Sequence, residues 1–459
     1  MKRRKKGIIV GAGPAGLFAA WRLAGKAEVT VIEKGKDIYD RHCPSHDRCI
    51  KCPSCGIIEG VGGAGGMSDG KLNLHPKIGG DLTEFITLEA AEALIDQVDR
   101  VFVEFGAPPA NQSDPAPLLR RAASCGIEFI PARQRHIGSD RLPSLIHQFK
   151  ESLINKGVQF ILQSRVEDII VQNNRCKGVC LGNVEIEADS VILAPGRAGS
   201  SWLAQLAHKY QLPTRHEPID VGVRVEVPAV CYDEAVQVNW DPKFRLRTPT
   251  YDDLVRTFCT NPCGFVIRET YGANGTGVNG HALHFQHSEN TNFAFLVKVD
   301  LTEPLEDTSA YGHSISHLAY TIGGGAPIIQ RLGDLKQGRR STWNRIDHSY
   351  VRPTLRVVTP GDISMALPHR IVTDIIEGLD MLDKVIPGVA SGSTLLYAPE
   401  IKFSALRIIT DKTLGSKIKG LYLAGDGAGL SRDIINAAIT GIIAADGIIG
   451  VTPIGATTH

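Results

Sequence analysis

The sequence predicts an α/β protein with a discontinuous Rossmann-like nucleotide-binding domain and an inserted, mainly antiparallel β domain. Three observations predict this fold. Residues 7–34 read as strand, glycine turn, helix and strand; residues 421–448 read as a second strand, glycine turn and helix; and the segment from residue 217 to about 300 alternates as antiparallel strands do. The predicted boundaries are 1–212 and 396–459 for the nucleotide-binding domain and 213–395 for the inserted domain.

The first unit has every part of a dinucleotide fingerprint. An apolar run at residues 8–10 suits a buried parallel strand, and G-x-G-x-x-G follows it at the start of a predicted helix. The first glycine permits a tight turn, the second lets the backbone approach a pyrophosphate, and the third lets helix and strand pack closely. Glu33 ends the second strand, where a carboxylate can accept hydrogen bonds from ribose hydroxyls. The predicted pyrophosphate-binding residues are Gly11, Gly13, Pro14, Ala15 and Gly16.

Composition disfavours several other classes of protein. With 50 basic and 49 acidic residues the net charge is +1, which argues against nucleic acid as an obligatory partner. The basic run at residues 2–6 precedes only three apolar residues, too few for a secretory signal. No stretch approaches the roughly 18 uninterrupted apolar residues of a membrane span. We therefore expect a cytoplasmic protein with no membrane partner.

Four of the ten cysteines lie in one short segment after the fingerprint: Cys43, Cys49, Cys52 and Cys55. The C-x2-C-x2-C spacing matches the first three ligands of a bacterial iron–sulfur motif, and four thiolates suit tetrahedral zinc nearly as well. A redox-active dithiol is a third interpretation, and four unconnected buried residues are a fourth. Metal or redox chemistry fits a cytosolic protein better than structural disulfides do.

The glycine-rich run GGAGGMSDGK comes next and is too rich in glycine for a helix or strand. Bare N–H groups in such a loop can approach a planar ring closely, and Ser68 and Asp69 can form hydrogen bonds at the edge of that ring. A flexible surface loop is the alternative. The predicted cofactor contacts in this loop are Gly66, Met67, Ser68, Asp69 and Gly70.

The middle of the chain alternates between helical and β patterns. Apolar residues at helical spacing predict a helix over residues 83–105, and a β-rich block over 158–193 ends in a glycine turn at Gly196. Such a strand and turn pass beside the cofactor in nucleotide-binding proteins, so Ala194 and Gly196 are predicted contacts. Val166, at the expected start of a strand, is predicted to meet the adenine ring.

Two histidine groups lie in or near the inserted domain. His281, His284 and His287 are spaced by three residues, and His313 and His317 by four. Neither group has a carboxylate at a convincing spacing, so we expect scattered polar histidines and no metal site.

The run GLYLAGDGAG near the C-terminus predicts a strand at residues 421–424, a turn at 425–427 and a helix at 433–448. Small residues along that helix allow close packing. We expect Gly425 and Asp426 to contact the cofactor, with the Asp426 carboxylate on a ribityl chain. The N-terminus of the helix is expected to face the pyrimidine edge of a flavin, where its dipole would stabilise the anionic reduced ring.

With both halves in view, the chain resembles the uncharacterised FAD-dependent dehydrogenases of the glutathione-reductase-like FAD superfamily. The resemblance covers nearly the whole chain and is carried by GAGPAG, the cysteine segment, GGAGGMSDGKL, DVGVRVEVP, RTFCTNP, VNGH, ENTNFAFLV, QRLGDLKQGRRST, APEIKF and GLYLAGDGAG. It implies a Rossmann-like FAD-binding domain and an inserted substrate domain. The remaining predicted FAD contacts are Lys34 and Arg41.

The predicted function is an FAD-dependent oxidoreductase that moves a hydride or electron pair between flavin and a small-molecule substrate, with electrons entering through the cysteine segment. No second fingerprint follows a strand, so we expect no dedicated NAD(P)H domain; transient nicotinamide binding over the flavin stays open. One alternative is an electron-transfer or redox-sensing flavoprotein with a redox protein partner. Another is an FAD-dependent RNA-modifying enzyme, which the charge balance disfavours. The substrate is expected near His281, Arg339, Arg340 or Glu400.

Overall fold

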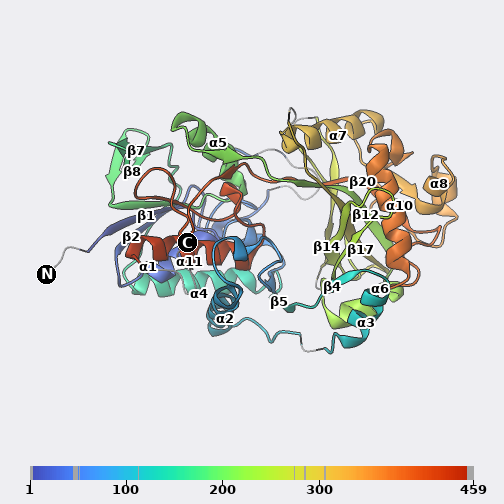
Figure 1. The fold of residues 1–459 in the computed structure, drawn as a ribbon, viewed down its shortest axis with the longest axis horizontal. Coiled ribbons are helices and arrows are strands. Elements are labelled where there is room, and N and C mark those ends of the chain that lie inside the picture. Colours follow the sequence, from blue (N-terminus) through green and yellow to red (C-terminus); the bar gives the residue numbers. More distant parts are fainter. Residues whose placement is uncertain are drawn as a thin grey trace. The chain divides into compact units, whose positions relative to one another are not determined.

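The computed structural model describes residues 4–44, 50, 52–111, 113–272, 274–283, 286–303 and 306–451. The chain divides into two compact units (Figure 1). The first unit comprises residues 1–110, 133–215 and 405–459, and the second comprises 111–132 and 216–404. The sequence placed the divisions at 212/213 and 395/396 and had no signal for the excursion of residues 111–132.

The first unit is built on a five-stranded parallel sheet in the order β22-β10-β1-β2-β6. Its central strand, β1, pairs Ile8 with Val191 on one side and with Thr30 on the other. This is the predicted Rossmann-like arrangement, and it forms because the central strands are apolar on both faces. The strands are β1 (Lys6–Val10), β2 (Glu28–Ile32), β6 (Gln159–Ile161), β10 (Ser190–Leu193) and β22 (Leu421–Leu423).

The first and last helices of this unit, α1 (Pro14–Leu23) and α11 (Ile434–Ile449), pack against each other (Figure 1). A Cβ at Gly441 would overlap the carbonyl oxygen of Ala15, so only glycine permits this approach. Phe18, Phe102 and Phe149 join α1 to two further helices in one aromatic cluster. Those helices and a third are α2 (Leu88–Glu104), α4 (Leu142–Asn155) and α5 (Ser200–Lys209).

Small antiparallel elements complete the first unit. A three-stranded sheet joins β7, β8 and β9, a ribbon joins β3 and β5, and β11 pairs with β21. Val166 is buried but precedes its strand, which begins at Asp168, so the predicted strand start was two residues early. The bounds are β3 (Lys71–Leu74), β5 (Arg133–His136), β7 (Asp168–Gln172), β8 (Arg175–Leu181), β9 (Val184–Glu187), β11 (Thr214–Arg215) and β21 (Arg407–Ile408).

The second unit contains an eight-stranded sheet in the order β19-β18-β20-β12-β17-β14-β13-β4, antiparallel except for β18 with β19. The predicted mainly antiparallel domain is therefore present. The strands are β4 (Glu128–Ile130), β12 (Ile219–Pro228), β13 (Lys243–Arg247), β14 (Leu254–Asn261), β17 (Asn290–Val299), β18 (Ile328–Arg331), β19 (Thr359–Pro360) and β20 (Leu395–Lys402).

The two faces of this sheet differ because residues alternate along β12. Val221, Val223 and Val225 enter a hydrophobic core with helix α10 (His369–Asp383), which lies along β12 and β17 (Figure 1). On the opposite face Asp220 and Arg224 are buried, and the hairpin of β15 (Phe265–Glu269) and β16 (Gly277–His281) contacts this face. We call it the polar face.

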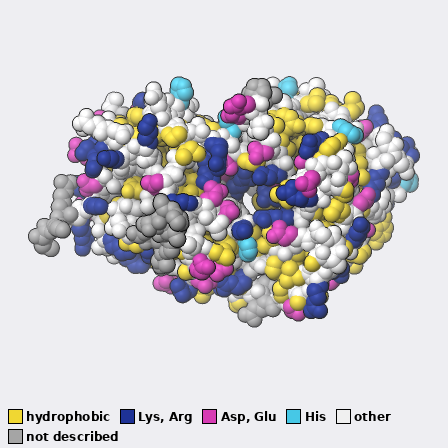
Figure 2. All heavy atoms as spheres, viewed as in Figure 1, with side chains coloured by type: hydrophobic (Ala, Val, Ile, Leu, Met, Phe, Trp, Pro, Cys, Tyr) yellow, Lys and Arg dark blue, Asp and Glu magenta, His cyan; other side chains and the backbone are white. Residues whose placement is uncertain are grey.

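The other helices of the second unit are α3 (Ala116–Ser124), α6 (Ala229–Val238), α7 (Thr308–Ile322), α8 (Leu332–Lys336) and α9 (Trp343–Asp347). None of the helices among the described residues combines the length and apolar character needed to cross a membrane. Figure 2 shows basic and acidic side chains scattered over the visible face, as a balance of 50 to 49 suggests.

A buried carboxyl pair makes the stability of the second unit depend on pH. Asp374 accepts a hydrogen bond from Thr248 Oγ1 at 2.6 Å and interacts electrostatically with Asp253, which Arg370 holds in an ion pair. Burial and the neighbouring Asp253 carboxylate raise the pKa of Asp374 to about 6. Since the folded-state pKa exceeds the unfolded one, the protonated form is favoured, and stability is lost as pH rises from about 4 through about 6.

We expect Asp374→Asn to remove this loss, because the amide stays neutral beside Asp253 and can still hydrogen-bond Thr248. At pH 7.5 the variant should be more stable than the parent by about 2 kcal/mol. At pH 4 the two proteins should differ by less than about 0.5 kcal/mol. Urea unfolding across this range measures the difference, and a constant offset at every pH would contradict the assignment.

Candidate functional site

The glycines of the fingerprint hold β1 against its neighbours. Gly11 has φ +105°, and a Cβ there would overlap the carbonyl oxygen of Ala194 at the end of β10. A Cβ at Gly16 would overlap the carbonyl oxygen of Gly11. Both positions therefore exclude any side chain, as expected for the tight turn and the close helix–strand packing.

Gly13 is different, because the space beside it is open. Its φ of −75° suits any residue, and an added Cβ would meet only Gly63 Cα at 3.7 Å. Pro14 begins α1, and within the described residues the amides of Ala15 and Gly16 have no hydrogen-bond acceptor. Open backbone and unsatisfied N–H groups at the positive end of a helix suit a pyrophosphate.

Glu33 is buried directly beside this turn. Its carboxylate accepts hydrogen bonds from the amides of Ala12 and Gly35, each at 2.8 Å, and from Gly60 at 3.0 Å. A carboxylate has about four acceptor positions, so about one remains for a ribose hydroxyl. The structure therefore gives Glu33 a second task that the sequence did not reveal, which is to tie the loop at Gly60 to the fingerprint.

Arg41 and Lys34 are engaged with the protein itself. The Arg41 guanidinium donates to the carbonyls of residues 56, 57, 61 and 63, and burial lowers the pKa of Arg41 to about 10. Lys34 forms an ion pair with Glu59 at 2.9 Å. In this structure both residues position the loop that follows, and their predicted contact with the cofactor stays a prediction.

The glycine-rich loop packs against the fingerprint. The amide of Gly62 donates to Ala12 O at 2.8 Å, and Ala64–Met67 form a short 3₁₀ turn where no regular structure was predicted. Ser68 Oγ donates to Gly65 O at 2.7 Å and accepts from the amide of Gly70 at 3.1 Å. Two further side chains, Asp69 and Lys71, form an ion pair at 3.2 Å. These bonds fix the loop beside the nucleotide turn.

The predicted C-terminal contacts meet the same turn. Gly425, at φ +78°, donates its N–H to Thr440 Oγ1 at 2.9 Å, and its Cβ position lies 3.1 Å from Ala15 Cβ. A Cβ at Gly427 would overlap the carbonyl oxygen of Gly196, so the two glycine turns touch. The structure thus brings Ala194, Gly196 and Gly425 together around the fingerprint.

Asp426 has a partner that the sequence analysis missed. Arg197 Nε donates to its carboxylate at 2.9 Å, and Arg197 Nη2 donates at 3.3 Å. The only available signal was the arginine of LAPGRAGS, which follows the predicted turn directly. An aspartate held in this way keeps acceptor positions for a sugar hydroxyl.

The N-terminus of α11 is already capped. Asp433 accepts a hydrogen bond from the amide of Asn436 at 2.7 Å, and Arg432 donates its amide to Gly79 O at 2.6 Å. A carboxylate at this end offsets part of the positive helix dipole. The predicted contact of this helix end with a flavin ring stays a prediction.

Three domain models match this chain in succession. Residues 9–42 match an NAD(P)-binding Rossmann-like domain, residues 83–217 an FAD binding domain, and residues 218–402 the C-terminal domain-like family of FAD-dependent proteins. These matches indicate an FAD-dependent oxidoreductase. The open backbone and the acceptor-free amides of the nucleotide turn fit the pyrophosphate of FAD, and the assignment of this turn as the FAD site of the flavoenzyme stays a prediction.

Similar proteins add less detail. An uncharacterised protein of Clostridium beijerinckii is 26% identical over 475 residues, covering 96% of this chain and 80% of the relative. Among solved structures, glycine oxidase from Bacillus cereus has 14% identity and a TM-score of 0.37, with 98% of each chain covered. Quinol fumarate reductase of E. coli has 12% identity and a TM-score of 0.40, covering 99% of this chain and 71% of that one. These structural likenesses carry no conclusion about the substrate.

The cysteine segment of the flavoenzyme is partly described. Cys43 is exposed, Cys52 and Cys55 are half-buried, and Cys49 lies outside the described residues. Within the described part of the chain, no group of three or more His, Cys, Asp or Glu residues is arranged to hold a metal ion. The predicted iron–sulfur or zinc site therefore gains no support here and stays a prediction.

The described members of the two histidine groups make separate local contacts. His313 stacks on Phe403 with ring centroids 4.5 Å apart, and His317 Nδ1 lies 3.1 Å from Asn274 O. His281 is exposed at the end of β16, and His284 falls outside the described residues.

The predicted catalytic arginines have local structural partners. Arg339 Nε donates to Asp334 Oδ1 at 2.8 Å, and Arg331 and Ser341 donate to the same carboxylate. These bonds hold the pKa of Asp334 below its usual range despite its burial. Arg340 contributes its carbonyl oxygen to Arg345 Nη1 at 2.8 Å. These contacts stabilise the turn after α8. They do not bring Arg339 and Arg340 together as a substrate-binding group.

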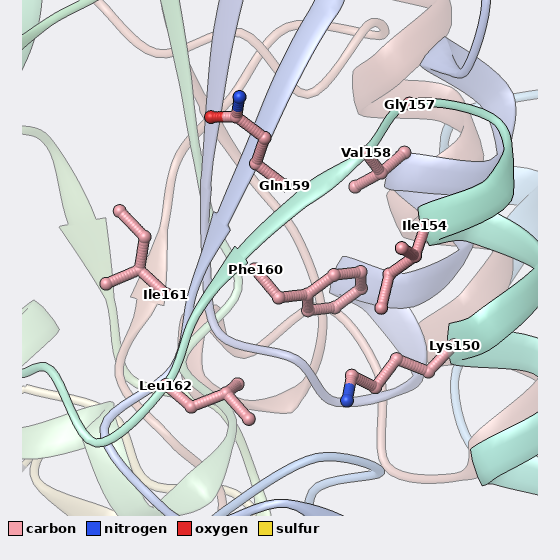
Figure 3. Close-up of a pocket in the computed structure, with 8 residues that line it drawn as sticks. All are labelled: Lys150, Ile154, Gly157, Val158, Gln159, Phe160, Ile161 and Leu162. Atoms are coloured by element: carbon pink, nitrogen blue, oxygen red, sulfur yellow. The ribbon is translucent and has the colours of Figure 1, made fainter.

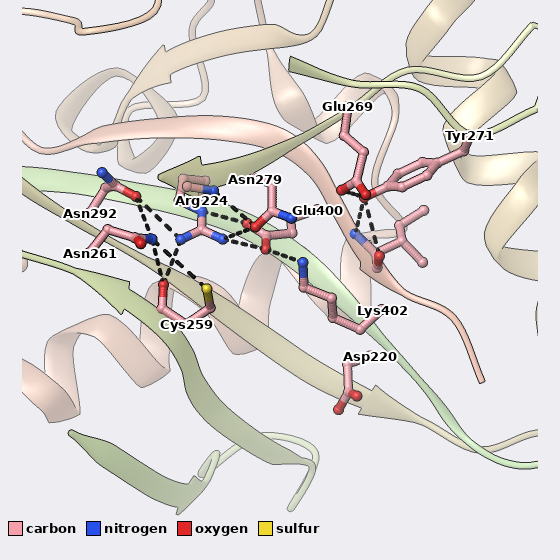
Figure 4. Close-up of polar contacts among 12 residues, drawn as sticks. Asp220, Arg224, Cys259, Asn261, Glu269, Tyr271, Asn279, Asn292, Glu400 and Lys402 are labelled. Atoms are coloured by element: carbon pink, nitrogen blue, oxygen red, sulfur yellow. Dashed lines mark hydrogen bonds and ion pairs between the residues drawn. The ribbon is translucent and has the colours of Figure 1, made fainter. Parts of the chain in front are cut away.

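Glu400 forms a completely buried ion pair with Arg224 on the polar face (Figure 4). Arg224 Nε and Nη2 donate to the two oxygens of Glu400 at 2.7 and 2.6 Å. The other donors of Arg224 reach Cys259 O, Asn292 and Asn279, and Lys402 Nζ lies 2.8 Å from Glu400. Burial disfavours the charge on Arg224, but Glu400 outweighs it and raises the pKa of the guanidinium.

A shallow pocket lies elsewhere in the first unit (Figure 3). It is lined by the end of α4 and by β6, with Phe160 and Ile154 on its apolar side and Lys150 at its rim. Lys150 is itself paired with Asp37. No predicted site residue lines this pocket.

Proposed function

We propose that this flavoenzyme transfers a hydride or an electron pair between its FAD and a small organic molecule. The observation that carries the proposal is the open backbone at Gly13 beside the acceptor-free amides of Ala15 and Gly16. When bound, FAD supplies the two-electron chemistry, while the protein supplies binding and orientation.

Residues of the first unit have separate roles in holding the cofactor. The amides of Ala15 and Gly16 bind the pyrophosphate, and the remaining acceptor position of Glu33 takes one hydroxyl of the adenosine ribose. Asp426, held by Arg197, accepts from the ribityl chain. Each role uses a group whose protein partners leave it at least one free donor or acceptor position.

Electron entry through the cysteine segment is a second part of the proposal. Its support is the C-x2-C-x2-C spacing together with the accessibility of Cys43 and the partial accessibility of Cys52 and Cys55. A redox-active dithiol or a metal cluster there would receive electrons from a protein partner. The net charge of +1 gives no support to RNA as the substrate.

An absorption spectrum and metal analysis of anaerobically purified protein test both parts. We expect about one FAD per chain, and iron, zinc or an oxidisable thiol pair in the cysteine segment. A colourless protein that cannot take up added FAD would refute the flavin assignment. A flavin-containing protein with neither metal nor reactive thiol pair would refute the electron-entry route alone.

A further inference from the structure

Three cations surround one aromatic ring on the polar face. Lys243 Nζ lies 4.8 Å from the centroid of the Phe258 ring, Arg256 Cζ 5.2 Å and Lys402 Nζ 5.8 Å. Three positive charges this close repel one another, and the ring offsets only part of that cost. We call these four residues the Phe258 cluster.

Carboxylates neutralise two members of the cluster individually. Arg256 forms a bidentate pair with Asp220 at 3.0 and 2.7 Å, and Lys243 pairs with Asp241. Both carboxylates are buried, and each forms an ion pair with one of the two cations. Neither of these two cations therefore has a full charge to offer a ligand.

Lys402 is the exception. Its carboxylate partner, Glu400, is already held by two hydrogen bonds from the fully buried guanidinium of Arg224. Four cations and three carboxylates thus make up the cluster and its ion-pair partners, and the surplus positive charge lies at Lys402. In Figure 4 the Lys402 ammonium points toward Glu400.

The surplus charge is accessible. The side chain of Lys402 is 15% exposed and that of Arg256 is 23% exposed, whereas Glu400 and Arg224 are completely buried. A partly desolvated ammonium held beside a ring attracts an anion more strongly than a fully hydrated one does. An incoming carboxylate would complete the charge balance without disturbing the buried pair.

From this geometry we propose that the Phe258 cluster is an anion subsite that binds the carboxylate of the substrate, so that the substrate class is a small organic carboxylate. Lys402 makes the direct ion pair, and Phe258 holds the cations in place. The substrate assignment rests on the proposed oxidoreductase function, while the anion subsite itself rests only on residues of the second unit.

Calorimetric titration of the purified holoprotein with benzoate tests the subsite, with benzamide as the uncharged analogue at the same ionic strength. We expect benzoate to bind at least tenfold more tightly than benzamide. Lys402→Met should raise the Kd for benzoate at least tenfold, and Lys402→Arg should retain most of the affinity. Lys384→Met, an exposed lysine at the end of α10 on the opposite side of the sheet, should leave the Kd unchanged.

Equal binding of benzoate and benzamide, or a Kd unaffected by Lys402→Met, would overturn the proposal. The outcome is separable from that of the proposed function, because the titration needs no turnover. A protein that holds FAD but ignores benzoate refutes the subsite only. A protein that binds benzoate through Lys402 but takes up no FAD refutes the oxidoreductase function only.

Discussion

Replacing Gly13 with alanine should leave a folded protein that binds FAD about 100-fold more weakly, a loss of about 2.7 kcal/mol. The added methyl group has room in the protein, since its only neighbour within 4 Å is Gly63 Cα at 3.7 Å. The methyl group would keep the pyrophosphate away from the backbone, because a close contact between the two requires glycine at this position. Fluorescence titration of the apoprotein with FAD measures the loss, and the melting temperature of the apoprotein should stay within about 2 °C of the parent.

Two other glycines make this result interpretable. Gly392→Ala is a matched control, because its Cβ would also lie 3.7 Å from a glycine Cα, that of Gly333, but in the second unit. It should leave FAD affinity unchanged. Gly11→Val should abolish FAD binding by disrupting β1 and β10, since its Cβ overlaps the backbone of Ala194. Undiminished FAD binding by Gly13→Ala would contradict the site assignment.

Replacing Glu400 with glutamine should destabilise the second unit by about 3–5 kcal/mol. The substitution removes the charge that compensates Arg224, whose side chain is completely buried. Glutamine also presents an N–H₂ group where the guanidinium needs an acceptor. Urea unfolding followed by circular dichroism measures the change in the free energy of unfolding.

An exposed ion pair provides the comparison for this variant. Asp380 pairs with Lys336 on the surface, with side chains that are 51% and 32% exposed, and Asp380→Asn should cost less than about 1 kcal/mol. If Glu400→Gln costs no more than Asp380→Asn, then the buried pair is not essential to the fold.

The sequence predicted the nucleotide turn well because every part of it is local. The predicted helix after G-x-G-x-x-G runs from Pro14 to Leu23 in the structure, and the flanking strands are present. A glycine at a position with no room for a side chain indicates a tight turn or a close backbone contact. The alternation in DVGVRVEVP likewise predicted β12 as an antiparallel strand.

Contacts between distant residues were not predictable in this way. Arg224 is a charged residue in an alternating strand, which normally indicates a solvent-facing position. Its partner Glu400 lies 176 residues away, and the sequence around either residue does not indicate that the two form a pair. The contacts of Arg41 were not predictable for the same reason, because the four carbonyl oxygens it binds belong to a loop whose path the sequence does not give.

The packing of α1 against α11 has a consequence for how this protein is made. During synthesis the strand, turn and helix of the fingerprint emerge from the ribosome long before β22 and α11, which come after residue 420. The second unit can close once residue 404 has been translated, since its segments end there. The nascent first unit must therefore wait with apolar surfaces uncovered until α11 has been translated, which makes this interval the time when a chaperone would be of most use.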